Sequence, residues 1–479
     1  MRPSLKFPFP RRADGRPLCI AHRGASAHAK EGTPKAYDFA ADLGSEMWEI
    51  DVWLSSDGVP LVSHDPVQNG ITLADHSRDE LHDLLPDLPD LNQTIEQARE
   101  RGQSLYLDLK AKGSGAPSVA LLLANVVDNA VLGAFDDTEA KLLIDNSCPY
   151  PVSVLVRAGE DPFERARATY ADIIHLCWEH ASDRPQDLVT PDLIARAQER
   201  GLGIVLWHEE RPDVLADLVK LPVLGICTDN PELMGGFHSI PDTGIEVVCH
   251  RGINHIAPEN TMASAHLTFD FGCDWLELDV RETADGEIMV LHDDTLDRTT
   301  SGSGKITDNT REALKDLDAG SWKDPHWHHE RIPHLSESIA LAKQHGKKIY
   351  IENKSVDPQK LLDFVAAHDF LDDCFFWSPN PQILLDMRAL SKDCNIKSNI
   401  VHHGSFERMV EQLQPQICEI QVKDWEVEAP LCREHGIRPM LQYFGSDPEV
   451  FVQIAKWRPE MINLDRADML LAALKEQMA

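Results

Sequence analysis

One set of chemically reactive residue types occurs twice in this chain, with a constant offset of 228 residues (22 to 250). The first copy reads His22-Arg23-Gly24, Glu31-Gly32-Thr33, Glu49-Ile50-Asp51-Val52, Asp57-Gly58 and His64-Asp65. The second copy reads His250-Arg251-Gly252, Glu259-Asn260-Thr261, Glu277-Leu278-Asp279-Val280, Asp285-Gly286 and His292-Asp293. A duplicated core would preserve apolar positions, whereas histidine, carboxylate, arginine and glycine are preserved here. Because these residue types bind metals and transfer protons, the repeat predicts two copies of one site.

Paired carboxylates make each copy a candidate metal site. Glu277 and Asp279 are two residues apart in a predicted strand, so their side chains point to the same face. Two such carboxylates repel each other unless a cation lies between them, and hard oxygen ligands favour Mg²⁺ or Ca²⁺ over zinc. A single Glu-x-Asp pair is also common on a solvated strand of an acidic protein. The second pair, Glu49 and Asp51 in the same context, favours the metal interpretation.

Two histidines in each copy follow predicted strands. Histidine has an unperturbed pKa close to neutrality, which suits a general acid and a general base. A single histidine is more often a structural residue, but a matched pair that occurs twice is not well explained in that way. We therefore predict His250 and His292, and likewise His22 and His64, as acid/base candidates.

Basic residues accompany these groups. Arg23 and Arg251 each follow the first histidine, where a planar guanidinium suits a phosphate or carboxylate oxygen. A salt bridge to the neighbouring carboxylates is the alternative, and both interactions can hold. A further carboxylate and ammonium end a fourth predicted strand, as Glu352-Asn353-Lys354 and as Asp108-Leu109-Lys110. The carboxylate could complete a set of metal ligands and the ammonium could hold an anion.

Both halves alternate short β-branched runs with helical patterns, which indicates a parallel α/β architecture. The strands predicted for the first half are Leu18–His22, Met47–Val52, Val59–His64, Ser104–Leu109, Leu142–Ile144, Val152–Val156, Ile173–Cys177, Gly203–Trp207 and Leu224–Thr228. These are nine for eight barrel positions, so one of them is expected outside the barrel. The strands predicted for the start of the second half are Ile245–His250, Trp275–Val280, Glu287–His292 and Lys348–Glu352, with helices at Thr261–Phe271 and Ser336–His345.

The reactive residues lie at the carboxyl ends of these predicted strands. In an eight-stranded β/α barrel those ends surround one mouth, which brings distant residues together. A doubly wound sheet would spread them along a line, and the chain shows no Gly-rich dinucleotide fingerprint. We therefore predict two tandem TIM-like (β/α)8 barrels, at residues 1–238 and 244–479, joined by a linker at Met234–Gly244.

Composition limits the partners. The formal charge of −33 argues against a nucleic acid or an anionic membrane, because both require a basic surface. The ten cysteines form no Cys-x-x-Cys pair, which favours free thiols in a reducing compartment. No signal peptide and no run of about 20 apolar residues is recognisable, so we predict a cytoplasmic protein without stable membrane insertion.

The second half resembles the glycerophosphodiester phosphodiesterase family over residues 247–354. Each element of the family pattern is present: His250–Gly252, Pro258–Thr261, Glu277–Val280, Asp285-Gly286, His292-Asp293, Leu296–Gly304 and Glu352–Lys354. The resemblance weakens afterwards, since Trp377-Ser378 stands where the family shows Ser-Phe and Met461–Asp465 matches the closing Thr-Asp-x-Pro only loosely.

The resemblance implies a TIM-like barrel that hydrolyses glycerophosphodiesters to glycerol 3-phosphate and an alcohol, using Ca²⁺ or Mg²⁺. It implies a role for each matched residue of the second half. The implied metal ligands are Glu277, Asp279 and Glu352, the acid/base pair is His250 and His292, and the phosphate-binding residues are Arg251 and Lys354. The implied partner is a small-molecule phosphodiester.

The first half resembles the same family as a divergent copy. It retains the corresponding set: His22 and His64 as acid/base, Arg23 and Lys110 for phosphate, and Glu49, Asp51 and Asp108 for the metal. It ends with a family-like Thr228-Asp229-Asn230-Pro231. However, Gly32 replaces the asparagine, the Arg-Thr-Thr-x-Gly element after the second histidine is missing, and Asp108 is one methylene shorter than Glu352.

Three hypotheses remain open from the sequence. The leading one is a metal-dependent glycerophosphodiesterase that acts mainly through the second half. The second is action on another lipid-derived diester, of the lysophospholipid, sphingolipid or phosphoinositide type. The third makes the first half a non-catalytic binding or scaffold domain. The sequence leaves the alcohol moiety, the physiological metal, the attacking nucleophile and the oligomeric state undetermined.

Overall fold

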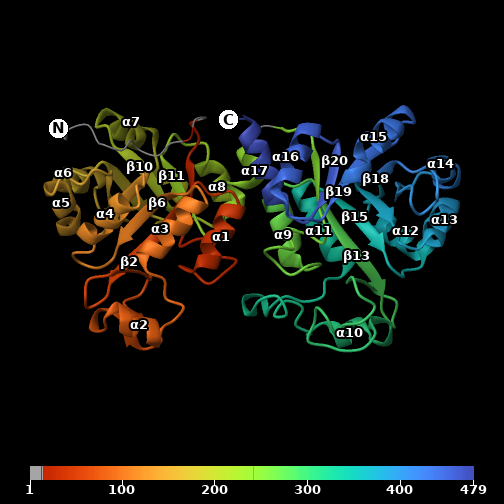
Figure 1. The fold of residues 1–479 in the computed structure, drawn as a ribbon, viewed down its shortest axis with the longest axis horizontal. Helices are drawn as coiled ribbons and strands as arrows, with labels where there is room; N and C mark the ends of the chain where they lie inside the picture. Colours follow the sequence, from red (N-terminus) through yellow and green to blue (C-terminus); the bar gives the residue numbers. More distant parts are fainter. Residues whose placement is uncertain (1–11, 13–14, 241, 479) are drawn as a thin grey trace. The chain divides into compact units, whose positions relative to one another are not determined.

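The structure, a computed structural model, describes residues 12, 15–240 and 242–478. The chain divides into two compact units, Met1–Gly235 and Gly236–Ala479, and each is described by itself (Figure 1). This division falls inside the expected linker Met234–Gly244, while the domain bounds 1–238 and 244–479 stay predictions. Within the described residues, no helix combines the length and the apolarity needed to cross a membrane.

The first unit is a closed barrel of eight parallel strands. In barrel order these are β1 (Leu18–His22), β2 (Met47–Leu54), β6 (Ser104–Leu109), β7 (Ala130–Ala134), β8 (Val152–Arg157), β9 (Ile173–Cys177), β10 (Gly203–His208) and β11 (Gly225–Thr228). Strand β1 pairs in parallel with both β2 and β11, which closes the ring. The connecting helices are α1 (Pro34–Asp42), α3 (Leu91–Glu100), α4 (Gly115–Ala124), α5 (Asp137–Asp145), α6 (Pro162–Thr169), α7 (Pro191–Glu199) and α8 (Pro212–Leu218).

The second unit repeats this plan. Its parallel strands are β12 (Glu246–Cys249), β13 (Trp275–Glu282), β15 (Lys348–Asn353), β16 (Cys374–Trp377), β17 (Lys397–Ser398), β18 (Ile417–Gln421), β19 (Arg438–Tyr443) and β20 (Met461–Leu464). A single parallel bridge between Phe376 and Ile396 connects the remaining two edges. The helices are α9 (Met262–Asp270), α11 (Leu335–His345), α12 (Pro358–Ala367), α13 (Pro381–Leu390), α14 (Phe406–Leu413), α15 (Trp425–Glu434), α16 (Pro448–Trp457) and α17 (Ala467–Met478). The prediction of two TIM-like barrels is confirmed.

Two of the predicted barrel strands are not barrel strands. The runs Val59–His64 and Glu287–His292 contain β3 (Pro60–Val62) and β14 (Ile288–Val290), which pair antiparallel to β2 and β13. The second histidine of each copy therefore lies in the loop after an antiparallel strand. A run of β-branched residues predicts a strand but not its pairing partner, which explains the difference.

The run Leu142–Ile144 was also wrong as a strand, because it belongs to α5, whose N-terminus is capped by Asp136. The strand that was missed is β7, Ala130–Ala134, which is rich in small residues. Its Gly133 is required by packing, since a Cβ atom there would lie 2.7 Å from the Tyr106 hydroxyl inside the barrel. Small residues have low β propensity, so the barrel interior and not the local sequence determines this strand.

Each barrel carries an insertion after its antiparallel strand (Figure 1). In the first unit it contains β4 (Val67–Gln68), β5 (Ile71–Thr72), η1 (Leu73–Asp75) and α2 (Arg78–Leu84). In the second unit it contains η5 (Ile306–Asp308), α10 (Arg311–Leu314) and η6 (Pro325–Trp327). Separate small apolar clusters hold the insertions, around Leu73 and Leu81 in the first and around Ile306 and Leu314 in the second. The main cores fill the barrel interiors and the layer between strands and helices.

Candidate active sites

Strand register brings three carboxylates together at the mouth of each barrel. Asp279 on β13 is the register partner of Glu352 on β15, and Glu277 points to the same side as Asp279. The side-chain oxygens of these three residues lie within 4.8 Å of one another, and all three side chains are buried. In the first unit, β2 and β6 place another buried set in the same way, formed by Glu49, Asp51 and Asp108.

The electrostatics of these clusters fit a divalent cation. Burial, followed by the charges of Asp279 and Glu352, raises the pKa of Glu277 well above its usual value. Burial likewise raises the pKa of Glu352, that of Glu49, and that of Asp108 to about 6. Among the described residues, Glu277 Oε1 and Asp108 Oδ1 have no hydrogen-bond partner. Buried carboxylate oxygens without partners match the oxygen ligands that Ca²⁺ and Mg²⁺ use in proteins.

Basic side chains lie directly beside the carboxylates. Lys354 Nζ is 3.0 Å from Asp279 Oδ1 and also contacts Glu352, while Arg251 Nε is 3.4 Å from Asp279 Oδ2. Burial opposes ionisation of Asp279, but Lys354 and Arg251, together with His292 and Asn260, lower the pKa of this carboxyl. In the first unit Lys110 Nζ and Arg23 Nε lie 3.0 and 2.9 Å from Asp51. The salt-bridge alternative is therefore realised in both units, and it leaves positive charge next to the metal candidates.

A tight turn after the first strand of each barrel fixes the backbone position of the arginine. Arg23 and Arg251 have positive φ angles of 56° and 58°, and their backbone N–H groups donate to Glu49 and Glu277. The glycine that follows packs against the next helix. A Cβ atom on Gly252 would lie 2.6 Å from the Ser264 side chain, so this position accepts glycine alone.

The first histidine of each unit is held by an aspartate that the sequence did not predict as a site residue. His250 Nδ1 lies 2.8 Å from Asp465 Oδ1, and His22 Nδ1 lies 2.7 Å from Asp229 Oδ1. This contact places the proton on Nδ1 and leaves Nε2 for proton transfer. Asp229 and Asp465 follow the last strands, β11 and β20, so the only sequence signal was the closing Thr-Asp-x-Pro pattern, which Asp465 matches loosely.

The second histidine of each unit pairs with the aspartate that follows it. His292 Nδ1 is 2.6 Å from Asp293 Oδ1, and His64 Nδ1 is 3.0 Å from Asp65 Oδ1. Burial lowers the pKa of His292, which favours the neutral imidazole. Arg298 donates to Asp293 at 2.7 Å and to Glu259 at 2.7 Å, which fixes this loop in the second unit.

An asparagine distinguishes the second carboxylate site from the first. Asn260 Nδ2 donates to Asp279 Oδ2 at 2.8 Å and its carbonyl accepts from the Asp279 backbone at 3.2 Å. The matched residue in the first unit is Gly32, which has no side chain to make these bonds. Accordingly both carboxylate oxygens of Asp51 are without a hydrogen bond among the described residues, although cations lie near them.

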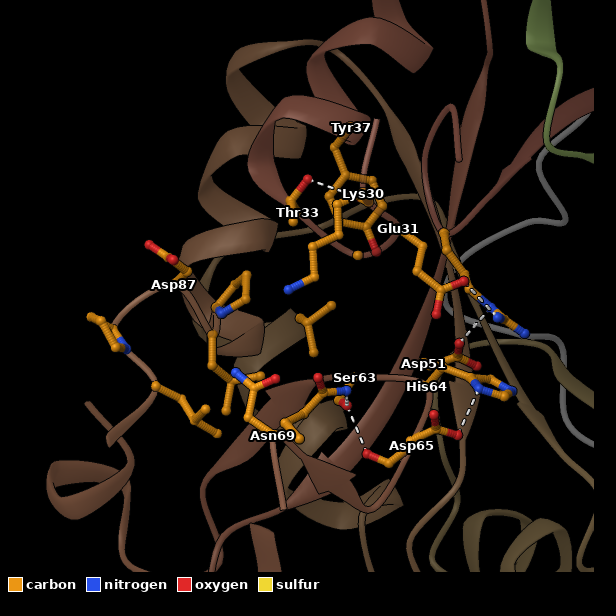
Figure 2. A pocket seen from close by; sticks show the side chains of 18 of the residues that line it. Lys30, Glu31, Thr33, Tyr37, Asp51, Ser63, His64, Asp65, Asn69 and Asp87 are labelled. Carbon is orange, nitrogen blue, oxygen red and sulfur yellow. Dashed lines mark hydrogen bonds and ion pairs between the residues drawn. The ribbon is translucent and has the colours of Figure 1, made fainter. Parts of the chain in front are cut away.

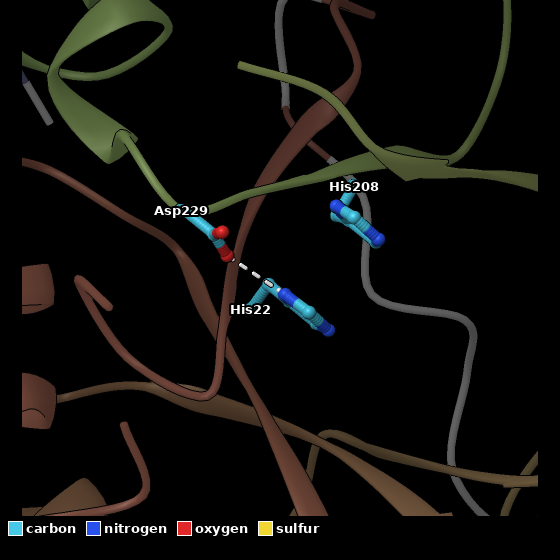
Figure 3. A group of neighbouring side chains, drawn as sticks. All are labelled: His22, His208 and Asp229. Carbon is cyan, nitrogen blue, oxygen red and sulfur yellow. Dashed lines mark hydrogen bonds and ion pairs between the residues drawn. The ribbon is translucent and has the colours of Figure 1, made fainter. Parts of the chain in front are cut away.

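A stacked ring covers the first histidine of each unit. The ring centroids of His250 and Phe444 are 4.1 Å apart, whereas His22 stacks on His208 at 4.6 Å with an interplanar angle of 2°. Figure 3 shows His22, His208 and Asp229 together. Two parallel imidazoles direct their in-plane lone pairs side by side and not at one point, so this trio does not have the geometry of a metal site. Neither stacking residue was predicted from the sequence.

A cavity of about 260 Å³ opens beside the first carboxylate cluster. Its lining includes Arg23, Asp51 and His64, and also residues 84–89 at the end of the insertion. Figure 2 shows these side chains around the open space, with the ammonium of Lys30 directed into it.

Comparison with known proteins identifies the family. The family model described as "Glycerophosphoryl diester phosphodiesterase family" matches residues 22–110 and 250–380, one segment in each barrel. The chain belongs to this family. A glycerophosphodiester phosphodiesterase from Caldanaerobacter subterraneus is 36% identical over 156 residues, covering 31% of this chain and 64% of the relative. One from Bacillus subtilis is 32% identical over 191 residues, covering 37% of this chain and 59% of the relative.

The chain thus spans about three fifths of the length of these curated relatives. Among solved structures, a glycerophosphodiester phosphodiesterase from Agrobacterium tumefaciens shares 32% identity, with a TM-score of 0.46 and coverage of 48% of this chain and 99% of that chain. An Oleispira antarctica phosphodiesterase in complex with sn-glycerol-3-phosphate shares 27% identity, with a TM-score of 0.44 and coverage of 50% and 98%. The two segments that the family model matches, residues 22–110 and 250–380, agree with the tandem duplication predicted from the sequence.

Proposed function

We propose that this protein is a divalent-metal-dependent phosphodiesterase that hydrolyses glycerophosphodiesters to glycerol 3-phosphate and an alcohol, mainly in the second barrel. The observation that carries this proposal is the arrangement at one barrel mouth. Three buried carboxylates lie beside two histidines, and each histidine is paired with its own aspartate. Membership of the glycerophosphoryl diester phosphodiesterase family supports the substrate class.

Glu277, Asp279 and Glu352 would hold Ca²⁺ or Mg²⁺. When bound, the cation would polarise the phosphoryl group and offset the repulsion between an anionic substrate and three carboxylates. Such a local cation is needed because the whole chain has a formal charge of −33. Asn260 would keep Asp279 oriented by donating to one of its oxygens.

Arg251 and Lys354 would bind the phosphoryl oxygens. Both lie beside the carboxylates. Burial lowers the pKa of each, but Asp279 and the other neighbouring carboxylates together raise it above its usual value, so both groups remain charged. A guanidinium and an ammonium on the same side of the cluster can contact different oxygens of one phosphate. Their position next to the metal ligands would hold the phosphoryl group beside the carboxylate cluster.

His250 and His292 would transfer the protons of hydrolysis. One imidazole takes the proton of the attacking hydroxyl, and the other gives a proton to the oxygen of the departing alcohol. The reaction breaks one P–O bond, forms another and consumes one water molecule. Asp465 and Asp293 fix the ring orientation by accepting from Nδ1.

The first barrel has its own equivalent set, so we propose that it is a second, divergent site. His22, His64, Arg23 and Lys110 surround the ligand candidates Glu49, Asp51 and Asp108. The first barrel has no counterpart of the Asn260 amide or of the Arg298 guanidinium. Both absences favour a different substrate for this half. A purely structural first barrel would not need buried carboxylates without hydrogen-bond partners.

The test compares two matched double variants with glycerophosphocholine as substrate and glycerol 3-phosphate release as readout. Glu277→Gln with Asp279→Asn should abolish the reaction, whereas Glu49→Gln with Asp51→Asn should leave most of it. Excess chelator on metal-stripped wild-type protein should also abolish turnover. Undiminished turnover in chelator contradicts the metal mechanism, and the reverse order of the two variants contradicts the assignment of the main site.

A further inference from the structure

The cavity beside the first carboxylate cluster differs from the same region of the second barrel at three matched positions. Lys30 stands where the second copy has Pro258, and Gly32 stands where it has Asn260. The backbone at the second of these positions is the same, with φ of 67° at Gly32 and 57° at Asn260. The loop conformation is therefore retained while an amide is removed and an ammonium is added.

The third difference is the absence of an arginine. In the second barrel Arg298 connects Asp293 to Glu259, and both of these carboxylates are neutralised there. Their counterparts in the first barrel are Asp65 and Glu31. Among the described residues, Asp65 pairs with His64, Glu31 pairs with Arg23, and no guanidinium connects the two. This loss leaves room next to the reacting groups.

One cation of the cavity lining has no carboxylate partner among the described residues. Glu31, Asp51 and Asp65 line the cavity, but each has an arginine, lysine or histidine within 3.0 Å. By contrast, no hydrogen bond or ion pair of the Lys30 ammonium occurs among the described residues, and Figure 2 shows this group pointing into the space. The carboxylate of Asp87 points away from the space in the same view.

The rest of the lining suits a polar chain next to an apolar wall. Gln68 and Asn69 bring amide groups, which can bond to hydroxyls. Leu84, Leu88 and Val62 form the apolar part of the lining. Lys30 itself is exposed, so its side chain is accessible to a ligand that enters the cavity.

We infer that this cavity is a subsite for a second anionic group, so that the first barrel binds phosphodiesters carrying another phosphate about one glycerol unit from the reacting one, with Lys30 as the recognising residue. This inference rests on the proposed function and names the substrate class of its first site. In the second barrel the matched loop offers no such ammonium, because Pro258 occupies the position of Lys30. The reaction itself is unchanged: one P–O bond is exchanged with water, the released hydroxyl takes the proton, and the second phosphodiester stays intact.

Two probes differ by one glycerophosphoryl group, which carries the second anion. Bis(glycerophospho)glycerol contains two phosphodiesters joined by a glycerol, and glycerophosphoglycerol contains one. Kinetics would be measured in the Glu277→Gln, Asp279→Asn background, so that only the first barrel acts. Lys30→Met should raise KM for the two-phosphate probe about tenfold, the usual weight of a lost hydrogen bond to a charged group, and change the one-phosphate probe less than about twofold. Lys30→Arg should retain the preference.

The matched control is Lys141→Met, an exposed lysine on α5 outside the cavity, which should leave both probes unchanged. Equal effects of Lys30→Met on the two probes, or no effect on either, would overturn the inference. A uniform effect would show that Lys30 acts through the general field of the site and not through the second anion.

Binding separates this inference from the proposed function. Calorimetry with Mg²⁺ present, in the same background with His22→Ala added, measures affinity without turnover. Tighter binding of the two-phosphate probe that Lys30→Met removes supports the subsite even if the first barrel hydrolyses neither probe, in which case the proposed activity of that barrel fails alone. Absence of binding by both probes, or binding that Lys30→Met does not weaken, overturns the subsite.

Discussion

At the scale of single residues, the histidine–aspartate pairs explain how each mouth can transfer protons. The carboxylate of Asp465 accepts from His250 Nδ1 at 2.8 Å and also from the Asn254 side chain at 2.7 Å. Burial raises the pKa of Asp465, but His250, Asn254 and Arg251 together lower it below its usual value, so this carboxylate stays ionised. An ionised acceptor fixes one imidazole tautomer, which an amide does not.

Asp465→Asn should therefore lower kcat on glycerophosphocholine by about 10²–10⁴-fold, as expected when the acid/base imidazole is held in the wrong tautomer. KM should change much less, because Asp465 is placed to orient the ring and not to bind phosphate. Steady-state kinetics measure both constants, and circular dichroism checks the fold. The exposed Asp372→Asn is the control and should behave as wild type. Near-normal kcat in Asp465→Asn would remove the pair from the mechanism.

At the scale of elements, the turn after the first strand of each barrel depends on glycine for two reasons. Gly252 has a φ of +79°, which side chains rarely adopt, and a Cβ atom there would also collide with Ser264 on α9. Gly304 has a φ of +83° but open space around it. The two positions therefore separate backbone strain from steric collision.

Gly304→Ala should lower the free energy of unfolding by about 1 kcal/mol, the cost of a left-handed backbone alone. Gly252→Ala should cost more, about 2–4 kcal/mol, because α9 must also move. It should in addition reduce activity, since the neighbouring Arg251 N–H donates to Glu277. Urea unfolding of both variants measures the difference, and equal losses would show that α9 accommodates the methyl group.

The same scale shows what the sequence could and could not predict. Runs such as Leu18–His22 and Ser104–Leu109 were predicted with the bounds that the structure has, because β-branched and leucine-rich segments carry their own signal. β7 was missed because its Gly133 has low β propensity. The glycine is required there by the Tyr106 side chain, which comes from another strand of the barrel. The pairing of β3 and β14 depends on tertiary contacts in the same way.

The constant spacing between the two copies predicted the site residues that occur twice in the same order. The carboxylates, the two histidines, the arginine and the lysine of each copy all reach their own barrel mouth. Asp229 and Asp465 lie more than 200 residues from their histidines, so only barrel closure makes them neighbours. His208 ends β10 and Phe444 follows β19, so their stacking on the first histidines depends on the arrangement of strands in the barrel, which no local pattern encodes.

At the scale of the whole molecule, the two barrels fill their interiors with different chemistry. In the first, the Tyr106 hydroxyl contacts Ser153 at 2.8 Å and His175 Nδ1 at 3.0 Å. In the second, Lys397 forms a buried ion pair with Glu419. Burial lowers the pKa of His175 to about 3, so this ring is neutral in the folded protein at neutral pH.

The acid stability of the first barrel should reflect His175. Above the ordinary pKa of 6.5, His175 is neutral in both the folded and the unfolded protein. Below pH 6.5 the imidazole binds a proton in the unfolded chain but stays neutral in the folded protein. The free energy of unfolding should therefore fall between pH 6.5 and about 3, by up to several kcal/mol from this group. His175→Gln should destabilise the protein less at pH 4.5 than at pH 7.5 in thermal or urea unfolding. The same loss at both pH values would contradict a neutral buried ring.

The last prediction concerns metal binding by the full chain. Each barrel has its own carboxylate cluster, so calorimetry on metal-stripped protein should show two binding events, and each double variant of the test above should remove one. The first site has Asp108 where the second has Glu352, and the shorter side chain withdraws the carboxylate oxygens by about one bond length. The first site also has no amide that corresponds to Asn260, which orients Asp279 in the second site. A flexible Ca²⁺ shell tolerates this better than a strict Mg²⁺ octahedron, so the first site should prefer Ca²⁺ over Mg²⁺ more strongly than the second.

Asp108→Glu should then shift the first site toward Mg²⁺, by about three- to tenfold in the ratio of the two affinities, without altering the second. Burial raises the pKa of Asp108 to about 6, and a cation can bind only the ionised form. Affinity at the first site should accordingly weaken as pH falls from 7.5 to 5.5, with protons released on binding. A single binding event in wild-type protein, or an Asp108→Glu variant with an unchanged Ca²⁺ preference, would show that the third carboxylate does not set the choice of metal.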